Sequence, residues 1–176
     1  MRVAALYVDV QNGPYTAIAN VDCWGVERDA RTYGGPWPVV AHPPCKAWGR
    51  FRWRSSDDGL TAFSALESVR QYGGVLEHPA HSRFWHAAGL SRPNEFPDVC
   101  GGYAVEVRQY DWGHRCVKPT WLYIVGSRQL PEMPARRIQT PGSLPNLITI
   151  PRSQRHLTPP LFAAWLVEVA RLCAIN

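Results

Sequence analysis

The sequence lacks a long apolar run. None of its 176 residues belongs to a stretch approaching the roughly 18 consecutive apolar residues of a membrane span. The N-terminus also lacks the pattern of a signal peptide, because Arg2 is followed by Asp9 without a small-residue cleavage site. We therefore expect a cytoplasmic protein that does not contact a membrane.

The sequence also lacks paired cysteines. The five cysteines are odd in number and scattered, and no two have CxxC spacing (Cys23, Cys45, Cys100, Cys116 and Cys173). This usage excludes a disulfide-stapled secreted scaffold and predicts reduced thiols.

Acidic residues are too few to balance the basic ones. The chain has 14 Asp and Glu against 19 Lys and Arg, nearly all of them arginine, which gives a net charge of +5. Arginine suits bidentate recognition of phosphates and base edges, so the balance points to a nucleic acid or nucleotide partner. The length predicts a single domain over residues 1–176.

A strand–helix–strand unit organises the chain. Val39–Ala41 is a short apolar run that predicts a buried strand, and two prolines end it directly before Cys45. Leu60–Tyr72 has apolar residues at helical spacing, and the following strand, Gly73–Leu76, runs into Glu77. A crossover helix predicts parallel strands, so Cys45 and Glu77 are expected at the same edge of the sheet.

The other elements complete an α/β fold. We expect antiparallel pairing in the second half of the chain, and a long loop before the last helix. The expected elements are strands at Val3–Val10, Tyr103–Tyr110 and Thr120–Val125, a helix at Ser82–Ala88, a loop at Ser127–Pro151, and a last helix entered through Thr158-Pro159-Pro160.

The order of these motifs resembles the cytosine-5 DNA methyltransferases. Four of their motifs have counterparts in this chain: the catalytic Pro-Cys, Glu-Asn-Val, an arginine motif before a strand ending in Val-Gly, and the last helix. The counterparts are Pro43-Pro44-Cys45, Glu77-His78-Pro79, Trp112–Lys118 followed by Trp121–Gly126, and the helix after Thr158. The resemblance implies a compact three-layer, methyltransferase-like (Rossmann-like) sheet.

The resemblance also implies a covalent mechanism on a pyrimidine. Cys45 would add to carbon 6 of cytosine, and Glu77 would protonate or hydrogen-bond N3 and contact the exocyclic N4. Arg115, or alternatively Lys118, would contact O2. The ring must be activated at N3, because the addition places negative charge there.

The segment after Cys45 stands where these enzymes have a mobile loop that closes over a flipped base. It interleaves aromatic and basic residues, and we expect Trp48, Arg50 and Arg52 to stack on bases and contact phosphates. His42, with Lys46 and Arg50, would favour the Cys45 thiolate. His42 and His78 would also border the substrate.

This chain differs from the cytosine-5 methyltransferases in the loop that would bind the cofactor and in the domain that would recognise the target sequence. The glycine loop that would hold S-adenosylmethionine is reduced to Tyr7–Gly13, so Asp9 and Gly13 would line it, with Asp22 or Glu27 as the ribose-binding acid. Only Ser127–Pro151 replaces the target-recognition domain. The substrate would then be DNA, as a single strand, or a pyrimidine nucleotide, with any recognition of a duplex site supplied by a separate subunit. So compact a form suggests a phage or mobile-element origin.

Two alternatives compete with the enzyme. His42 and Cys45, like His78 and His81, are separated by two residues, as zinc ligands often are, and His86 and His114 add further candidates. The same fold could also be a non-catalytic nucleic-acid-binding module or a decoy.

Overall fold

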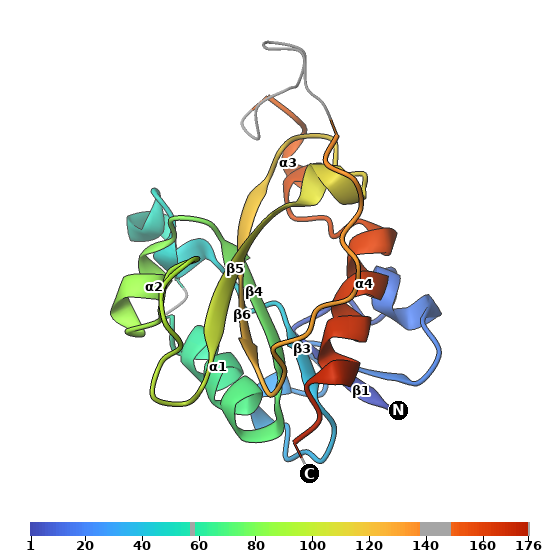
Figure 1. The fold of residues 1–176 in the computed structure, drawn as a ribbon. Helices are drawn as coiled ribbons and strands as arrows, with labels where there is room; N and C mark the ends of the chain where they lie inside the picture. Colours follow the sequence, from blue (N-terminus) through green and yellow to red (C-terminus); the bar gives the residue numbers. More distant parts are fainter. Residues whose placement is uncertain (57–58, 138–148, 176) are drawn as a thin grey trace.

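One mixed sheet forms the centre of the protein. The computed structural model describes residues 1–56, 59–137 and 149–175. Within them the strand order is β2-β1-β3-β4-β6-β5 (Figure 1). The strands are β1 (Val3–Leu6), β2 (Val21–Trp24), β3 (Val39–Ala41), β4 (Gly74–Pro79), β5 (Tyr103–Arg108) and β6 (Pro119–Val125).

The first four strands are parallel, as the crossover predicts. β1 pairs with β2 and β3, and β3 pairs with β4, with Ala41 opposite Leu76. β6 lies antiparallel between β4 and β5. The α/β class and the parallel strand–helix–strand unit are confirmed, and the connecting helix α1 spans Leu60–Tyr72 as expected.

Two strand boundaries differ from the sequence prediction. β1 ends at Leu6 because Tyr7 has a positive φ of 61°, which breaks the extended backbone before Val10. β4 continues through Glu77 to Pro79 because β6 pairs with it over that whole length. Glu77 therefore lies inside a strand, whose alternation fixes where its side chain points.

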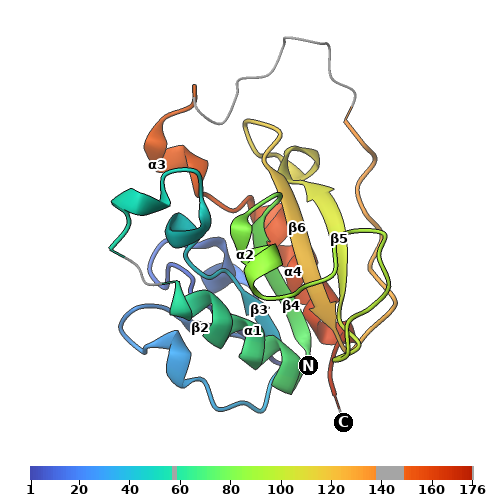
Figure 2. The same cartoon turned by 90° about the vertical axis from the view of Figure 1, so that its left-hand side faces the viewer.

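Helices cover both faces of the sheet, which makes three layers (Figures 1 and 2). α4 (Pro160–Leu172) packs on one face, where Phe162 and Leu166 join Val40 and Val75 in one core. α1 and α2 (Arg83–Ala87) pack on the other face. We call these the α4 face and the α1/α2 face. In Figure 2 the α1/α2 face is turned toward the viewer.

A glycine pair fixes the register between β3 and β4. Gly73 ends α1 with a φ of 75°, and Gly74 begins β4 with a φ of 125°. A Cβ on Gly74 would lie 2.0 Å from the carbonyl oxygen of Val39. Only glycine therefore allows the two strands to pair from their first residues, which sets His42 and Glu77 side by side at their other ends.

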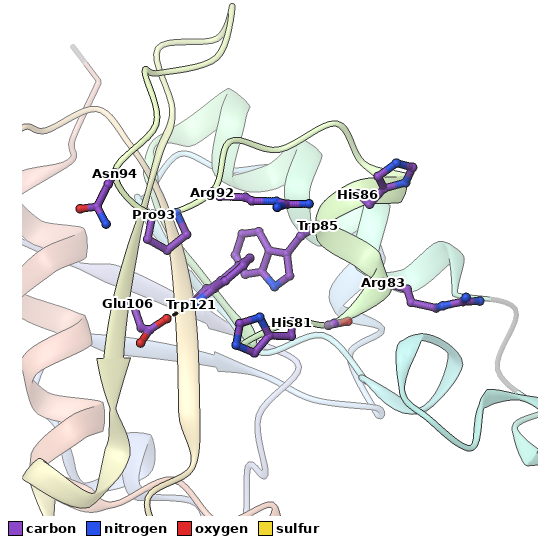
Figure 3. Close-up of a pocket in the computed structure, with 10 residues that line it drawn as sticks. His81, Arg83, Trp85, His86, Arg92, Pro93, Asn94, Glu106 and Trp121 are labelled. Carbon is purple, nitrogen blue, oxygen red and sulfur yellow. Dashed lines mark hydrogen bonds between the residues drawn. The ribbon is translucent and has the colours of Figure 1, made fainter.

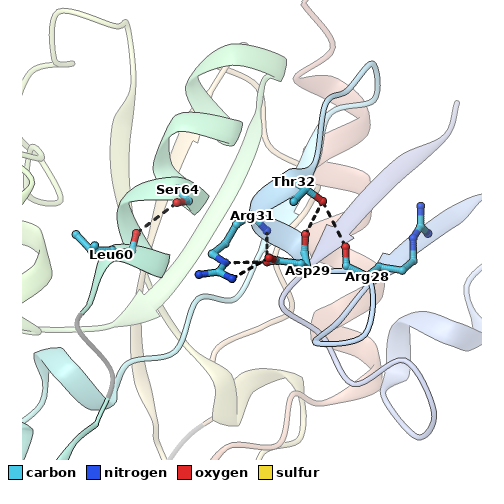
Figure 4. Close-up of polar contacts among 6 residues, drawn as sticks. All are labelled: Arg28, Asp29, Arg31, Thr32, Leu60 and Ser64. Carbon is cyan, nitrogen blue, oxygen red and sulfur yellow. Dashed lines mark hydrogen bonds and ion pairs between the residues drawn. The ribbon is translucent and has the colours of Figure 1, made fainter.

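Local hydrogen bonds hold the connection between β2 and β3. Between β2 and β3, Asp29 accepts hydrogen bonds from the backbone and side chain of Arg31, and Thr32 Oγ1 donates to the Asp29 carbonyl (Figure 4). The last small helix is α3 (Arg152–Arg155). The expected loop at 127–151 has no helix or strand in its described part, and residues 138–148 lie outside the described residues. In the ranges that the structure describes, no helix has the length and apolar character to cross a bilayer.

Candidate active site

The strand order reverses between β1 and β3, and the site lies at the carboxyl ends of those strands. From β1 the chain moves outward to β2 and then returns to β3 on the other side of β1. In open α/β sheets such a switch point is where ligands bind. His42 follows β3 there, Glu77 lies on β4, and Tyr15 comes from a short 3-10 helix after β1, Pro14–Ala17.

A chain of hydrogen bonds joins these residues on the α4 face. The Tyr15 hydroxyl lies 2.5 Å from His42 Nε2, and His42 Nδ1 lies 3.1 Å from Glu77 Oε2. Gln109 Nε2 donates to Glu77 Oε1 at 2.9 Å and to Thr120 Oγ1 at 3.0 Å. A carboxylate only accepts, so His42 Nδ1 donates to Glu77 Oε2. We call these five residues the polar chain.

The polar chain keeps Glu77 ionised. Burial alone would raise the pKa of this carboxyl, but the hydrogen bond and charge of His42, with the charge of Lys118, hold its pKa at about 2. The side chain of Glu77 is 13% exposed, so one edge remains open to a ligand. Glu77 is therefore equipped to accept hydrogen bonds from a substrate, whereas the alternative role of donating a stored proton is disfavoured.

Cys45 lies beside this carboxylate. It follows the two prolines, precedes the 3-10 helix Lys46–Trp48, and is exposed. Partial loss of hydration and the charge of Glu77 raise the pKa of its thiol, and Lys118 and Lys46 oppose that rise without overcoming it. The expectation that neighbouring cations favour the thiolate is therefore corrected for the free protein. His42 cannot serve as the base, since Tyr15 and Glu77 occupy both of its ring nitrogens.

Lys118 is a cation that acts on both Glu77 and Cys45. Its Nζ donates to the carbonyl of Leu157 at 2.9 Å. Burial lowers the pKa of Lys118, and the charges of Glu77 and Cys45 act in the opposite direction. Arg115 is exposed and donates instead to Gln154 Oε1 at 2.6 Å. The structure therefore favours Lys118 over Arg115, which it does not bring to the polar chain.

His78 does not border a substrate, which corrects that prediction. It neighbours Glu77 in β4, so its side chain points to the opposite, α1/α2 face. The residue is fully buried, and its ring packs 5.0 Å from that of Phe84. Neither ring nitrogen has a hydrogen-bond partner among the described residues.

The residues expected to hold S-adenosylmethionine are engaged elsewhere. Asp9 Oδ1 accepts from the backbone amides of Gln11 and Asn12, so it caps its own turn. A Cβ on Gly13 would lie 2.3 Å from the Asp9 carbonyl oxygen, so this glycine serves to close that turn. Asp22 pairs with Arg28 at 2.6 Å and accepts from Trp24 Nε1 at 2.9 Å. These residues, as arranged, do not fit the cofactor.

The thiol opens into a basic pocket of about 350 Å³. Trp48, Arg50 and Arg52 line it from the segment after Cys45, and Arg83 lines it from the start of α2. The three guanidinium groups form no ion pair within the parts of the chain that the structure describes. Unpaired arginines around a thiol are suited to an anionic substrate such as a nucleotide phosphate.

The ligand set that the zinc alternative requires is not formed in the described residues. They contain no group of three or more His, Cys, Asp or Glu side chains placed to hold a metal ion. His78 lies on the other face, and His114 Nδ1 accepts from the backbone amide of Cys116.

Sequence reasoning missed three members of the polar chain: Tyr15, Gln109 and Thr120. Gln109 and Thr120 lie where the predicted antiparallel strands end and begin, and both are completely buried. A polar residue at such a position is a usable signal, because it needs a partner inside the protein. Tyr15 lies in a short connection that gives no signal of this kind.

Searches against models of protein families, against curated proteins and against solved structures find no match to this chain. The functional assignment therefore depends on the geometry of Cys45, the polar chain and the arginine-lined pocket.

Proposed function

We propose that the protein adds the Cys45 thiolate to carbon 6 of a cytosine ring, in DNA or a nucleotide, and so activates carbon 5 for modification. One observation carries the proposal. A solvent-accessible thiol and an ionised, hydrogen-bonded carboxylate stand at the same end of two neighbouring parallel strands, close enough that Glu77 shifts the pKa of Cys45. The resemblance to the cytosine-5 methyltransferases supports the same pair of residues.

The chemistry balances with the residues present. As the S–C6 bond forms, the C5=C6 electron pair moves to C4–C5 and the C4=N3 pair moves to N3, which takes a proton from solvent. Glu77 accepts hydrogen bonds from N3–H and the exocyclic amine, and Lys118 donates to O2. Carbon 5 then takes an electrophile while the N3=C4 double bond re-forms and N3 returns its proton to solvent. Solvent removes H5, and the electrons of the C5–H bond form C5=C6 and expel the thiolate. With a solvent proton as the electrophile, the net reaction is exchange of H5.

Substrate binding would also lower the raised pKa of the Cys45 thiol. The Glu77 charge helps to keep Cys45 protonated in the free protein. Hydrogen bonds from a pyrimidine neutralise part of that charge, and so lower the pKa of Cys45 once the ring is bound. The thiolate is then formed where its target is present.

The group added to carbon 5 follows from the resemblance alone. It implies a methyl group, although Asp9, Gly13 and Asp22 do not offer the expected cofactor contacts. The test of the proposal therefore must not depend on a donor.

The test is exchange of H5 for deuterium in D₂O, followed by mass spectrometry of cytosine in single-stranded DNA and in deoxycytidine monophosphate. Wild-type protein is expected to catalyse exchange, and Cys45→Ser to reduce it by at least about 10³-fold, as nucleophile removal does in other enzymes. Cys100→Ser, which removes another exposed thiol, is the matched control. Equal exchange by Cys45→Ser, or no exchange by wild type on either substrate, would refute the proposal. A parallel reaction with S-adenosylmethionine examines the donor separately.

A second candidate function is nucleic-acid binding without catalysis. The raised pKa of Cys45 and the unpaired arginines of the pocket favour it. In that case wild type binds single strands but shows no exchange. Arg50→Ala and Arg52→Ala would each weaken binding and reduce its salt dependence by about one counterion.

A further inference from the structure

A second cavity of about 490 Å³ adjoins the Cys45 pocket. Trp85 of α2 and Trp121 of β6 form its apolar wall, with their rings 5.5 Å apart (Figure 3). Arg92 and Glu106 border it on either side of these rings (Figure 3). The volume lies within the range of small-ligand sites.

The two cavities share part of their lining. His81, Ser82 and Arg83 border both of them. Arg83 therefore lies between the space beside Cys45 and the space beside the two tryptophans. Its guanidinium has no ion pair among the residues that the structure describes, so it is available to an anion lying between the two cavities.

The lining of the second cavity matches the chemistry of a nucleobase. His81 is exposed and meets the Trp121 ring edge to face, with ring centroids 5.1 Å apart, so the exposed imidazole itself offers an aromatic surface for stacking. Glu106 Oε2 accepts from Trp121 Nε1 at 2.7 Å, which fixes a carboxylate whose other lone pairs can accept from base N–H groups. Arg92 is exposed at the rim and adds a second contact for phosphate.

We propose that this second cavity binds the nucleotide adjacent to the reacting cytosine, so that the substrate is a single strand of nucleic acid and not a free nucleotide. That the Cys45 pocket holds the reacting cytosine rests on the proposed function. Arg83 holds the phosphate that joins the two nucleotides. Placing neighbouring bases in two separate cavities requires them to unstack, which a single strand allows at lower cost than a duplex.

Binding of fluorescent oligonucleotides to the unreactive Cys45→Ser protein tests the inference. The ligands are deoxycytidine monophosphate, a hexamer with one cytosine, and the same hexamer with an abasic site on the 5′ or the 3′ side of that cytosine. An RNA hexamer distinguishes the two kinds of strand. We expect the intact hexamer to bind at least about 10-fold more tightly than the mononucleotide, and one abasic position to remove about 10-fold of that affinity.

Variants test whether the tighter binding of the hexamer arises in the second cavity. Arg92→Ala and Glu106→Gln should weaken hexamer binding several-fold and leave mononucleotide binding unchanged. Arg31→Ala is the matched control, since Arg31 pairs with Asp29 in the β2–β3 connection (Figure 4) and lines neither cavity.

The inference is overturned if the mononucleotide binds as tightly as the hexamer, if neither abasic site matters, if Arg92→Ala binds like Arg31→Ala, or if no ligand binds. These outcomes are separate from failure of the proposed function. Strand binding with the expected variant pattern but without H5 exchange by wild type supports the second cavity and refutes the chemistry. H5 exchange by wild type, with no contribution of neighbouring nucleotides to binding, supports the chemistry and refutes the role of the second cavity.

Discussion

Glu77→Gln protein is expected to lose H5 exchange by about 10²–10³-fold and, at the same time, to alkylate several-fold faster at Cys45. The first effect follows because the amide no longer carries the charge that stabilises a protonated N3 in the transition state. The second follows because the Glu77 charge raises the pKa of the Cys45 thiol. Without that charge the pKa falls, and more thiolate is present near neutral pH.

The two effects are measured in the same preparations. Exchange is followed in D₂O, and the alkylation rate of each cysteine is followed by peptide mass spectrometry after iodoacetamide treatment over a range of pH. Cys100 is exposed and serves as the internal control, whose rate should not change. Gln has nearly the size and shape of Glu and keeps one acceptor oxygen for His42 or Gln109, so circular dichroism should show a folded protein. If alkylation at Cys45 slows together with exchange, Glu77 does not influence the thiol as described.

The arrangement of the strands could be predicted from local patterns. The apolar run before Cys45, the helical spacing over Leu60–Tyr72 and the following glycines specify a parallel pair, and β3, α1 and β4 confirm it. These signals are strong because each element buries a face and because Gly74 permits the close approach to Val39. The predicted proximity of Cys45 and Glu77 depends only on this unit, and the charge effect between them supports it.

Side-chain direction was harder to predict, because it depends on how far a strand continues. The sequence suggested that β4 ends at Leu76, which would leave Glu77 and His78 free to turn toward one site. Pairing with β6 extends the strand to Pro79, so alternation sends Glu77 to the α4 face and His78 into the α1/α2 core. The partner strand that causes this lies more than forty residues later in the chain.

The electrostatics of the site depend on elements that local patterns do not connect. Lys118, immediately before β6, acts on Glu77, whereas Arg115 turns outward to Gln154. Tyr15 and Gln109 approach His42 and Glu77 from opposite directions along the sequence. Only the folded sheet brings them together, so neither the low pKa of Glu77 nor the high pKa of Cys45 was foreseeable from the residues nearby.

The same alternation that buries His78 predicts an unusual acid sensitivity. Burial lowers the pKa of His78 to about 4 from an ordinary value of 6.5, so the unfolded chain binds this proton at a higher pH than the native protein does. Native stability should therefore fall as the pH drops from about 6.5 to about 4, by on the order of 3 kcal/mol. The Glu77 carboxyl, with its pKa held at about 2, adds a separate loss below about pH 4.5.

His78→Leu should remove the loss of stability at the higher pH and leave the loss at the lower pH, which Glu77 causes, in place. Its free energy of unfolding at about pH 7.5 should equal or exceed that of wild type, because leucine replaces a ring whose two nitrogens find no partner in the described structure. Urea unfolding at a series of pH values measures both effects, and His86→Gln, at an exposed histidine, is the matched control. A wild-type curve that stays flat from about pH 6.5 to 4.5, or an unchanged slope in His78→Leu, would show that His78 is not held neutral by burial.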